Sequence, residues 1–186
     1  MPQSSIFRLI LSGALAGLAA ISVAPAAAEM LQFATPEGVK SWPKLPTIAE
    51  WHQDQDSSQK LGVNALIPDG MDPATADVSI QARGFSRAGG ASVTSASQMA
   101  ESDRAGAPSG TEVKQLSTVA DKDGTPFMLY SFAPANGQGA WKAIAYSEEG
   151  EYLLAFTLNA RSKAAYESNL PVFVGLIQKY ARDIPW

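Results

Sequence analysis

The chain has 186 residues, of which 46% are hydrophobic, and a net charge of −4 at pH 7, with one histidine and no cysteine. The lack of cysteine excludes disulfide bonds, thiolate catalysis and cysteine-based zinc or haem sites. The acidic balance, without any cluster of Lys and Arg, argues against nucleic acid and anionic membrane surfaces as partners.

The first 28 residues predict a cleaved signal peptide. Their apolar run, Leu9 to Val23, is shorter than the roughly 20 residues that a membrane-spanning helix needs. Small residues at Ala26 and Ala28 match the pattern before a signal-peptidase site, so we expect cleavage between Ala28 and Glu29. The mature protein is then expected in the periplasm or secreted, without stable membrane insertion. An uncleaved membrane anchor is the alternative interpretation.

Residues 29–47 predict an extended N-terminal arm, and residues 48–186 a single domain. Three prolines in the arm disfavour a helix, because each fixes its own φ and biases the residue before it toward extended backbone. We expect Trp42 to attach the arm to the domain by burying its indole ring.

The segment from Thr47 to about Gln55 predicts the first strand of the domain. The only histidine, His52, is followed by Asp54 and Asp56 at alternate positions, so a strand would place all three on one side, about 7 Å apart. Imidazole and carboxylate groups could share a metal ion or form an acid–base set. The competing interpretation is a solvated strand end, because a tight site needs three or four converging ligands with outer-shell support. The sequence assigns no catalytic residue and no cofactor.

The middle of the chain predicts strands and one short helix. In residues 76–85 apolar and polar residues alternate, which is typical of a half-buried strand. Ser95 with Gln98 fits a capping box at the start of a helix over 95–104. Asp123-Gly124 suits the positive φ of a hairpin turn. Further strands are expected at 62–68, 111–119 and 126–132.

The C-terminal part predicts a hairpin followed by a helix. Residues 141–147 and 151–159 form the hairpin, with Gly150 in a left-handed turn. The second of these segments is almost continuously apolar, which suits a central strand covered on both faces. Ser162 is expected to cap the helix, and Pro171 either to begin a second helix or to kink the first. The helix face expected to lie on the sheet consists of Phe173, Leu176, Ile177 and Tyr180.

These elements predict an α+β fold, with an antiparallel sheet of six to seven strands and a C-terminal helix packed on one face. The antiparallel order follows from the short connections, because parallel neighbours need crossovers of a dozen or more residues.

The order of these elements resembles the PsbP/Mog1-like superfamily. A Trp-bearing early segment is followed by the strand and turn NALIPDG, and the late hairpin leads into a helix with Tyr166, Phe173 and Ile177. The resemblance is greatest over residues 141–180. It implies an α/β/α sandwich and a role in binding other proteins, with no common catalytic set.

We therefore expect a non-enzymatic exported module that binds an envelope protein or a small ligand through its sheet face and loops. The alternative is a metal-dependent or acid–base hydrolase that uses His52, Asp54 and Asp56. A purely structural role in the envelope is a third interpretation. Most aromatic residues of the late strands should fill the core, while some could line a ligand groove; they are Tyr130, Phe132, Trp141, Tyr146, Tyr152 and Phe156.

Overall fold

The computed structural model describes residues 30–35, 38–87 and 92–181. The expected signal peptide, its cleavage site and part of the loop after Ser86 lie outside the described residues. The strands of the described part are β1 (Met30–Thr35), β2 (Gly38–Pro43), β3 (Trp51–Gln53), β4 (Asn64–Pro68), β5 (Val78–Ser86), β6 (Glu112–Ala120), β7 (Pro126–Ala133), β8 (Trp141–Glu149) and β9 (Tyr152–Ala160). Its helices are α1 (Gln55–Leu61), α2 (Ala96–Ala105) and α3 (Lys163–Lys179), with a 3-10 turn η1 (Ala135–Gly137).

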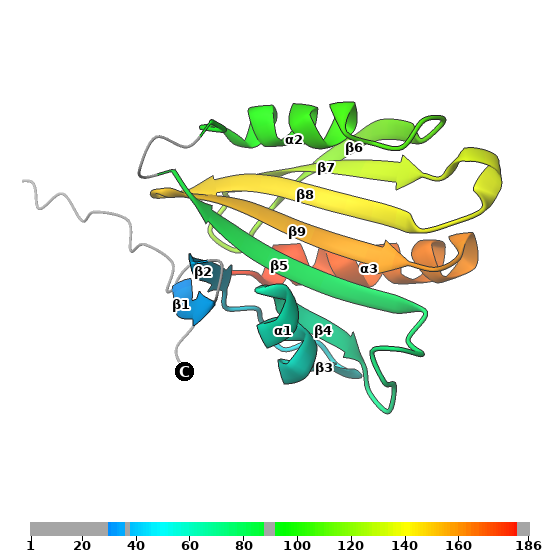
Figure 1. The fold of residues 1–186 in the computed structure, drawn as a ribbon, viewed down its shortest axis with the longest axis horizontal. Helices are drawn as coiled ribbons and strands as arrows, with labels where there is room; N and C mark the ends of the chain where they lie inside the picture. The colour runs from blue at the N-terminus through cyan, green and yellow to red at the C-terminus, as the bar shows by residue number, and fades with distance from the viewer. Residues whose placement is uncertain (1–29, 36–37, 88–91, 182–186) are drawn as a thin grey trace, which may run out of the picture.

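The strands form one antiparallel sheet with the order β1-β2-β5-β9-β8-β7-β6 along its main path (Figure 1). Two further strands join at the side, where β4 pairs with β3 and with the first half of β5. The long strand β5 pairs with β9 from Val78 opposite Ala160 to Ser86 opposite Tyr152. The predicted α+β class and antiparallel order are confirmed, with seven strands on the main path.

Helix α3 covers one face of the sheet. Its apolar stripe repeats at three- and four-residue spacing, so the stripe faces the sheet and is buried. Phe156 on β9 contacts Phe127 and Tyr180, with ring centroids 5.1 and 5.0 Å away. Pro171 lies inside one continuous helix, so the alternative of a second helix is wrong. The predicted face is confirmed: Phe173, Leu176, Ile177 and Tyr180 are each at most 1% exposed.

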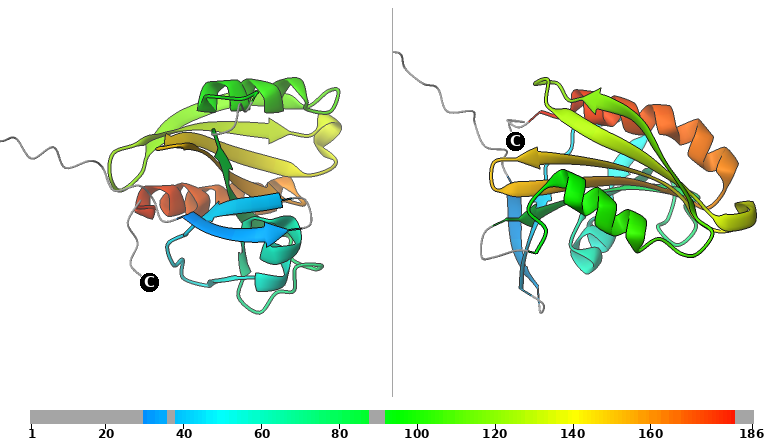
Figure 2. Two further views of the ribbon diagram at one scale, coloured as in Figure 1. Left: turned by 60° about the vertical axis from the view of Figure 1, so that its left-hand side comes forward. Right: turned by 90° about the horizontal axis from the view of Figure 1, so that it is seen from above.

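Helix α2 lies on the opposite face of the sheet from α3, as Figure 2 shows in the view from above. Its buried residues pack on Tyr146 of β8 and Leu153 of β9. The shorter helix α1 lies on the same side as α2, against β4, where the Ser58 hydroxyl accepts a hydrogen bond from the Ala65 N–H. The middle of this face, between α1 and α2, has no helix over it (Figure 1).

One prediction from the N-terminal half needs correction. The strand expected from Thr47 to Gln55 ends at Gln53, because Asp54 caps α1, which begins one residue later. Two further features add detail to the predicted elements. The segment 29–47 includes the extended strands of the hairpin β1–β2, which meets β5 through the pair Ser41 and Gly84. In β6 the register shifts between Gln115 and Thr118, which explains why its apolar residues recur at every third position.

Candidate functional site

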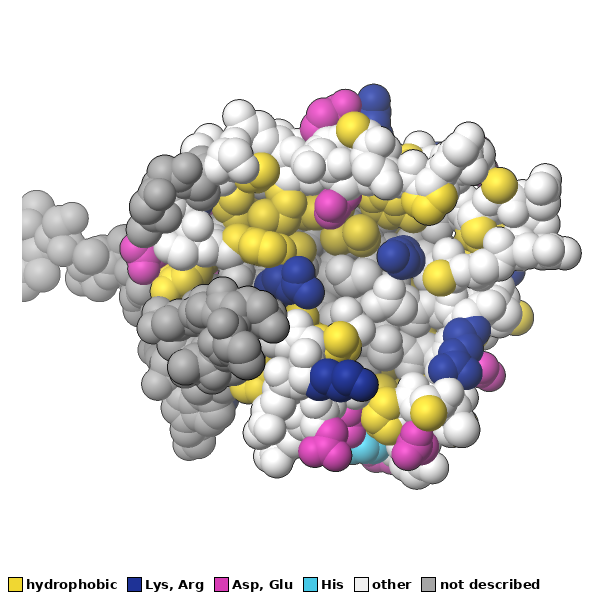
Figure 3. Space-filling view, in the orientation of Figure 1, with side chains coloured by type: hydrophobic (Ala, Val, Ile, Leu, Met, Phe, Trp, Pro, Cys, Tyr) yellow, Lys and Arg dark blue, Asp and Glu magenta, His cyan; other side chains and the backbone are white. Residues whose placement is uncertain are grey.

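A groove of about 1180 Å³ lies on the sheet face that α2 covers only in part. Its floor is formed by β5, β9 and β8, and its rim by α2 with the loops 106–111 and 134–140. Figure 3 shows a hollow below α2 in which hydrophobic side chains gather, with basic side chains along its lower side. The residues of the floor are Gln81, Arg83 and Phe85 on β5, Leu153, Ala155, Thr157 and Asn159 on β9, and Lys142 and Ile144 on β8.

The alternation of side chains along each strand determines this floor. Odd-numbered residues of β9, such as Ala155, point into the groove, whereas even-numbered ones, such as Phe156, point to α3. In the registers of the sheet, Ala155 lies opposite Arg83 on one side and Tyr146 on the other. Alanine projects only a methyl group at this position, so the side chain of Ala155 itself fills little of the groove.

Buried contacts and a hydrogen bond attach α2 to the sheet beside the groove. Met99 and Ala100 of α2 are buried against Tyr146 and Leu153. The Tyr146 hydroxyl donates a 2.6 Å hydrogen bond to Asp103 Oδ2 at the C-terminal half of the helix. Burial, and then this carboxylate, raise the pKa of Tyr146 above its usual value of 10.0, so the phenol remains a donor at any ordinary pH.

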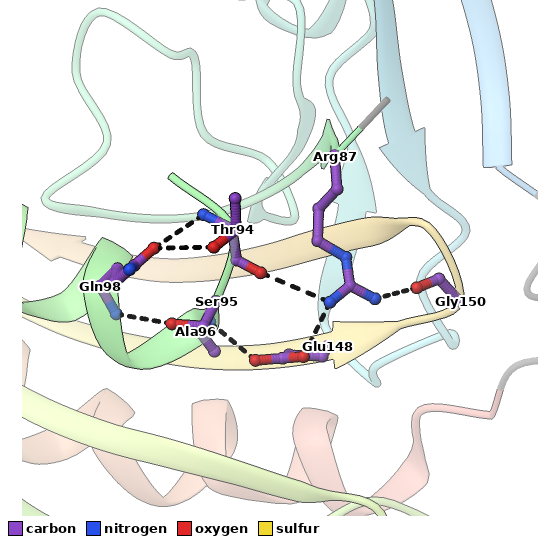
Figure 4. A network of polar contacts seen from close by, with 7 residues as sticks. All are labelled: Arg87, Thr94, Ser95, Ala96, Gln98, Glu148 and Gly150. Atoms are coloured by element: carbon purple, nitrogen blue, oxygen red, sulfur yellow. Dashed lines mark hydrogen bonds and ion pairs between the residues drawn. The ribbon is translucent and has the colours of Figure 1, made fainter. Parts of the chain in front are cut away.

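A polar network holds the start of α2 against the β8–β9 hairpin (Figure 4). Glu148 accepts from the Ala96 N–H at 3.0 Å with one carboxylate oxygen and pairs with Arg87 at 3.0 Å with the other. Arg87 also donates to the carbonyls of Thr94 and Gly150. A carboxylate near the first turn of a helix is favourable, because the free N–H groups there carry partial positive charge. The network therefore fixes both the position and the direction of α2.

The predicted capping box at this helix is confirmed in its first half only. The Ser95 side chain accepts from the Gln98 N–H at 3.2 Å, as expected of an N-cap. The Gln98 side chain, however, accepts from the Thr94 N–H at 2.8 Å and does not return to Ser95. Ser95 remains the N-cap, and the Gln98 side chain bonds to the residue before it instead of to Ser95 itself.

The far end of the groove is closed by two loops in close contact. Gly110 has a φ of +82°, and a Cβ at this position would lie 2.9 Å from the Cβ of Ala135. Only glycine combines this left-handed backbone with such close approach. The loop after α2 and the turn η1 therefore form one continuous wall.

Charge in the groove differs from that of the chain as a whole. The side chains lining it include two basic residues, Arg83 and Lys142, and one acidic residue, Asp103, in a chain of net charge −4. Asp103 already accepts the Tyr146 hydrogen bond. Neither basic side chain forms an ion pair with any described residue; the Arg83 guanidinium lies 5.4 Å from the ring centre of Phe85.

The three candidate residues of the sequence, His52, Asp54 and Asp56, lie outside the groove. His52 Nδ1 lies 3.0 Å from Asp69 Oδ1, and both side chains are well exposed. Asp54 accepts from the Ser57 N–H at 2.8 Å as the N-cap of α1, and hydrogen bonds from Ser57 lower its pKa. Asp56 belongs to the first turn of the helix. The expectation that a strand places all three on one side is wrong, because the strand ends before Asp54.

No group of three or more His, Asp or Glu side chains within residues 30–35, 38–87 and 92–181 has the arrangement of a metal site. No helix in the same part of the chain is sufficiently long and hydrophobic to cross a membrane.

Sequence reasoning missed most of the groove. The alternation over residues 76–85 predicts a half-buried strand but does not mark Gln81 or Arg83 as part of a site, and no pattern marks Thr157 or Asn159. Of the six aromatic candidates Phe132 lines the groove, Tyr130 and Tyr146 pack below α2, and Phe156 lies in the core on the other face. The available signal is a basic residue on each of two predicted strands, at positions 83 and 142.

Comparison with known proteins gives structural likenesses alone, since no protein-family model and no curated protein matches the chain. A protein of unknown function, PA94 from Pseudomonas aeruginosa, is 14% identical with a TM-score of 0.45, over 84% of this chain and 99% of that chain. LpqN, involved in cell envelope biogenesis of Mycobacterium tuberculosis, is 13% identical with a TM-score of 0.45, over 73% of this chain and 79% of that one.

A cyanobacterial PsbP from Synechocystis is 12% identical with a TM-score of 0.42, over 87% of this chain and 96% of that chain. The Ran-binding protein Mog1p from Saccharomyces cerevisiae is 10% identical with a TM-score of 0.40, over 79% and 85%. Structures of PsbP and Mog1 are thus among the similar structures.

Proposed function

We propose that this protein is an exported, periplasmic binding module that holds its ligand in the groove between α2 and the strands β5, β9 and β8. The observation that carries the proposal is the groove itself, a concave surface in which apolar side chains lie beside polar groups that can orient a ligand. The export part of the proposal is supported by the apolar run and the small residues before Glu29.

The size of the groove favours a ligand or a short segment of a partner over a broad protein interface. Its volume of about 1180 Å³ is close to the roughly 300–1,000 Å³ of small-molecule sites. The polar groups on its floor, among them Gln81, Thr157 and Asn159, can orient a ligand by hydrogen bonds.

The proposal is tested by filling the groove. The protein is produced from the full chain in its natural host and purified without denaturant from the envelope fraction, and bound compounds are identified by mass spectrometry. Ala155→Phe places a phenyl ring on the floor of the groove, while Ser168→Phe on the exposed side of α3 is the matched control.

We expect a compound at about one equivalent per chain with the parent and Ser168→Phe, and its loss from folded Ala155→Phe. A circular dichroism spectrum and melting curve establish that the variant is folded. Recovery of the same compounds with Ala155→Phe, or of none with the parent, would contradict the proposal. N-terminal sequencing of the same preparation should show a mature chain that begins at Glu29.

A further inference from the structure

The groove combines an apolar end with two basic side chains, and we infer from this juxtaposition that its ligand is an anionic amphiphile: one alkyl chain bearing a carboxylate or phosphate group. The inference rests on the proposed function and specifies the chemistry of the ligand.

The apolar end lies where β5 ends and β9 begins. Phe85 is 37% exposed and stands opposite Leu153 in the sheet register. Val93, Ile144 and Ala155 are only partly buried, although they adjoin the apolar cluster below α2. These side chains offer apolar surface that water now contacts, and an alkyl chain would be stabilised by each CH₂ group that it buries on them.

The basic side chains lie beside and beyond this apolar surface. Arg83 precedes Phe85 by two residues on the same side of β5, so its guanidinium borders the apolar end directly. Lys142 projects into the groove from β8. On that strand Tyr146 is the residue level with Arg83, with Ala155 of β9 between them, and Lys142 lies four residues before Tyr146. Strand spacing and rise place the two basic residues about 16 Å apart at their Cα atoms.

This separation suggests the orientation of the ligand. The acidic group would pair with Arg83, whose planar guanidinium can bind a carboxylate or phosphate through two hydrogen bonds. The alkyl chain would then extend over Phe85 and Val93. Any polar continuation of the head group would point toward Lys142 and the amide side chains of Gln81 and Asn159.

The floor of the groove argues against a peptide as the occupant. β9 is hydrogen-bonded along its length to β5 on one side and β8 on the other, so it offers no free backbone edge to an added strand. A peptide would bring a row of N–H and C=O groups that need partners, whereas an alkyl chain brings none. The charges also favour an anionic ligand over a neutral peptide, because Arg83 and Lys142 are both cationic and neither forms an ion pair with a described residue.

The test uses isothermal titration calorimetry with probes that share a ten-carbon chain, each kept below its micelle-forming concentration. Decanoate and decyl phosphate carry the anionic groups, decyl maltoside is neutral, and decyltrimethylammonium is cationic. We expect saturable 1:1 binding of at least one anionic probe, binding weaker by about fivefold or more for the other two head groups, and none for acetate. Preference between the two anionic probes identifies the acidic group.

Two pairs of variants connect binding to the groove. Arg83→Gln should weaken binding of the anionic probe by about fivefold to tenfold, while Lys60→Gln, an exposed lysine on α1 outside the groove lining, should leave it unchanged. Phe85→Ala should weaken binding of every probe by a similar factor. Its control is Leu116→Ala on β6, where the side chain is equally exposed at 39% but lies away from the groove.

Equal affinity for the anionic, neutral and cationic probes, or equal affinity of Arg83→Gln and the parent, would overturn the inference. Its failure is distinguishable from failure of the proposed function. A compound that Ala155→Phe excludes but that has no acidic group, or a peptide recovered in the same way, would refute the anionic amphiphile and leave the binding role intact.

Discussion

The two faces of the sheet are covered by helices of different reach, and a single strand shows the difference. On β9 the side chains that meet α3 are Leu154, Phe156 and Leu158, all at most 1% exposed. The alternate residues of the same strand run from buried Leu153 to the half-buried Thr157 and Asn159. The face below α3 is a closely packed core. The face below α2 is left open as a groove beyond the reach of that ten-residue helix.

The comparison teaches that one strand can serve two differently covered faces through the alternation of its side chains. On β9 the even-numbered residues Leu154, Phe156 and Leu158 are bulky and apolar, whereas the odd-numbered residues beyond Leu153 are small or polar. The variants below test this difference and the rest of the site, beginning with the face on which the effect should be largest.

Phe156→Ala should lower the free energy of unfolding by about 3–5 kcal/mol, because it leaves a cavity between β9, Phe127 and Tyr180. Urea denaturation measures the change. Phe85→Ala, on the groove face, should change the same free energy by less than about 0.5 kcal/mol, because that ring is already partly in water. Equal losses for the two variants would break the distinction between the faces.

Tyr146→Phe should cost about 1 kcal/mol at pH 7, since it removes the hydrogen bond to Asp103 while the exposed carboxylate can bind water instead. The folded protein raises the pKa of Tyr146 above 10.0, so above about pH 10 only the unfolded chain loses this proton.

The contribution of Tyr146 is therefore fully present below pH 10 and decreases as the pH rises further. Denaturation curves between pH 7 and 11 should show the stability of the parent approaching that of Tyr146→Phe. A constant difference in stability between the parent and Tyr146→Phe over this pH range would mean that folding does not raise the pKa of Tyr146.

Glu148→Gln should destabilise the protein by about 0.5–1 kcal/mol, because it removes the charge that pairs with Arg87 and faces the first turn of α2. In Glu148→Gln, amide hydrogen exchange should be faster than in the parent over α2, with little change over α3. Glu151→Gln at the same hairpin is the control and should have little effect. Faster exchange in α3 alone would show that the network does not hold α2.

His52→Ala should have the smallest effect, below about 0.5 kcal/mol, because its contact with Asp69 is between two exposed side chains. Metal analysis of the parent and this variant distinguishes the binding module from the metal-dependent hydrolase. Stoichiometric metal in the parent that disappears in His52→Ala would favour the hydrolase and would place function far from the groove.

The sequence predicted the fold best where two independent patterns agree. Residues 141–180 combine a hairpin with Gly150 at a φ of +54° and a helix whose apolar stripe fits the strand before it, and all of these are confirmed. The segment around Asp54 was mispredicted, because alternation over a few polar residues also fits a helix start. The competing signal was present: an Asp followed three residues later by Ser57, whose N–H it caps.

The groove could not be predicted in the same way, because it depends on which strands become neighbours. Arg83 and Ala155 lie far apart in the chain and meet only through the pairing of β5 with β9. Nor does the sequence determine how far α2 reaches over the sheet, which depends on the contacts of Glu148 and Asp103 with elements distant in sequence.

The same pairing has a consequence for how the chain is made. Synthesis proceeds from the N-terminus, so β5 exists long before β9, the strand that completes its edge from Val78 to Ser86. During that interval its hydrogen-bonding edge and apolar side are open to other nascent chains, a recognised cause of aggregation. Chaperone binding of the incomplete chain should therefore persist until residue 160 has emerged, and premature stops before β9 should yield insoluble products.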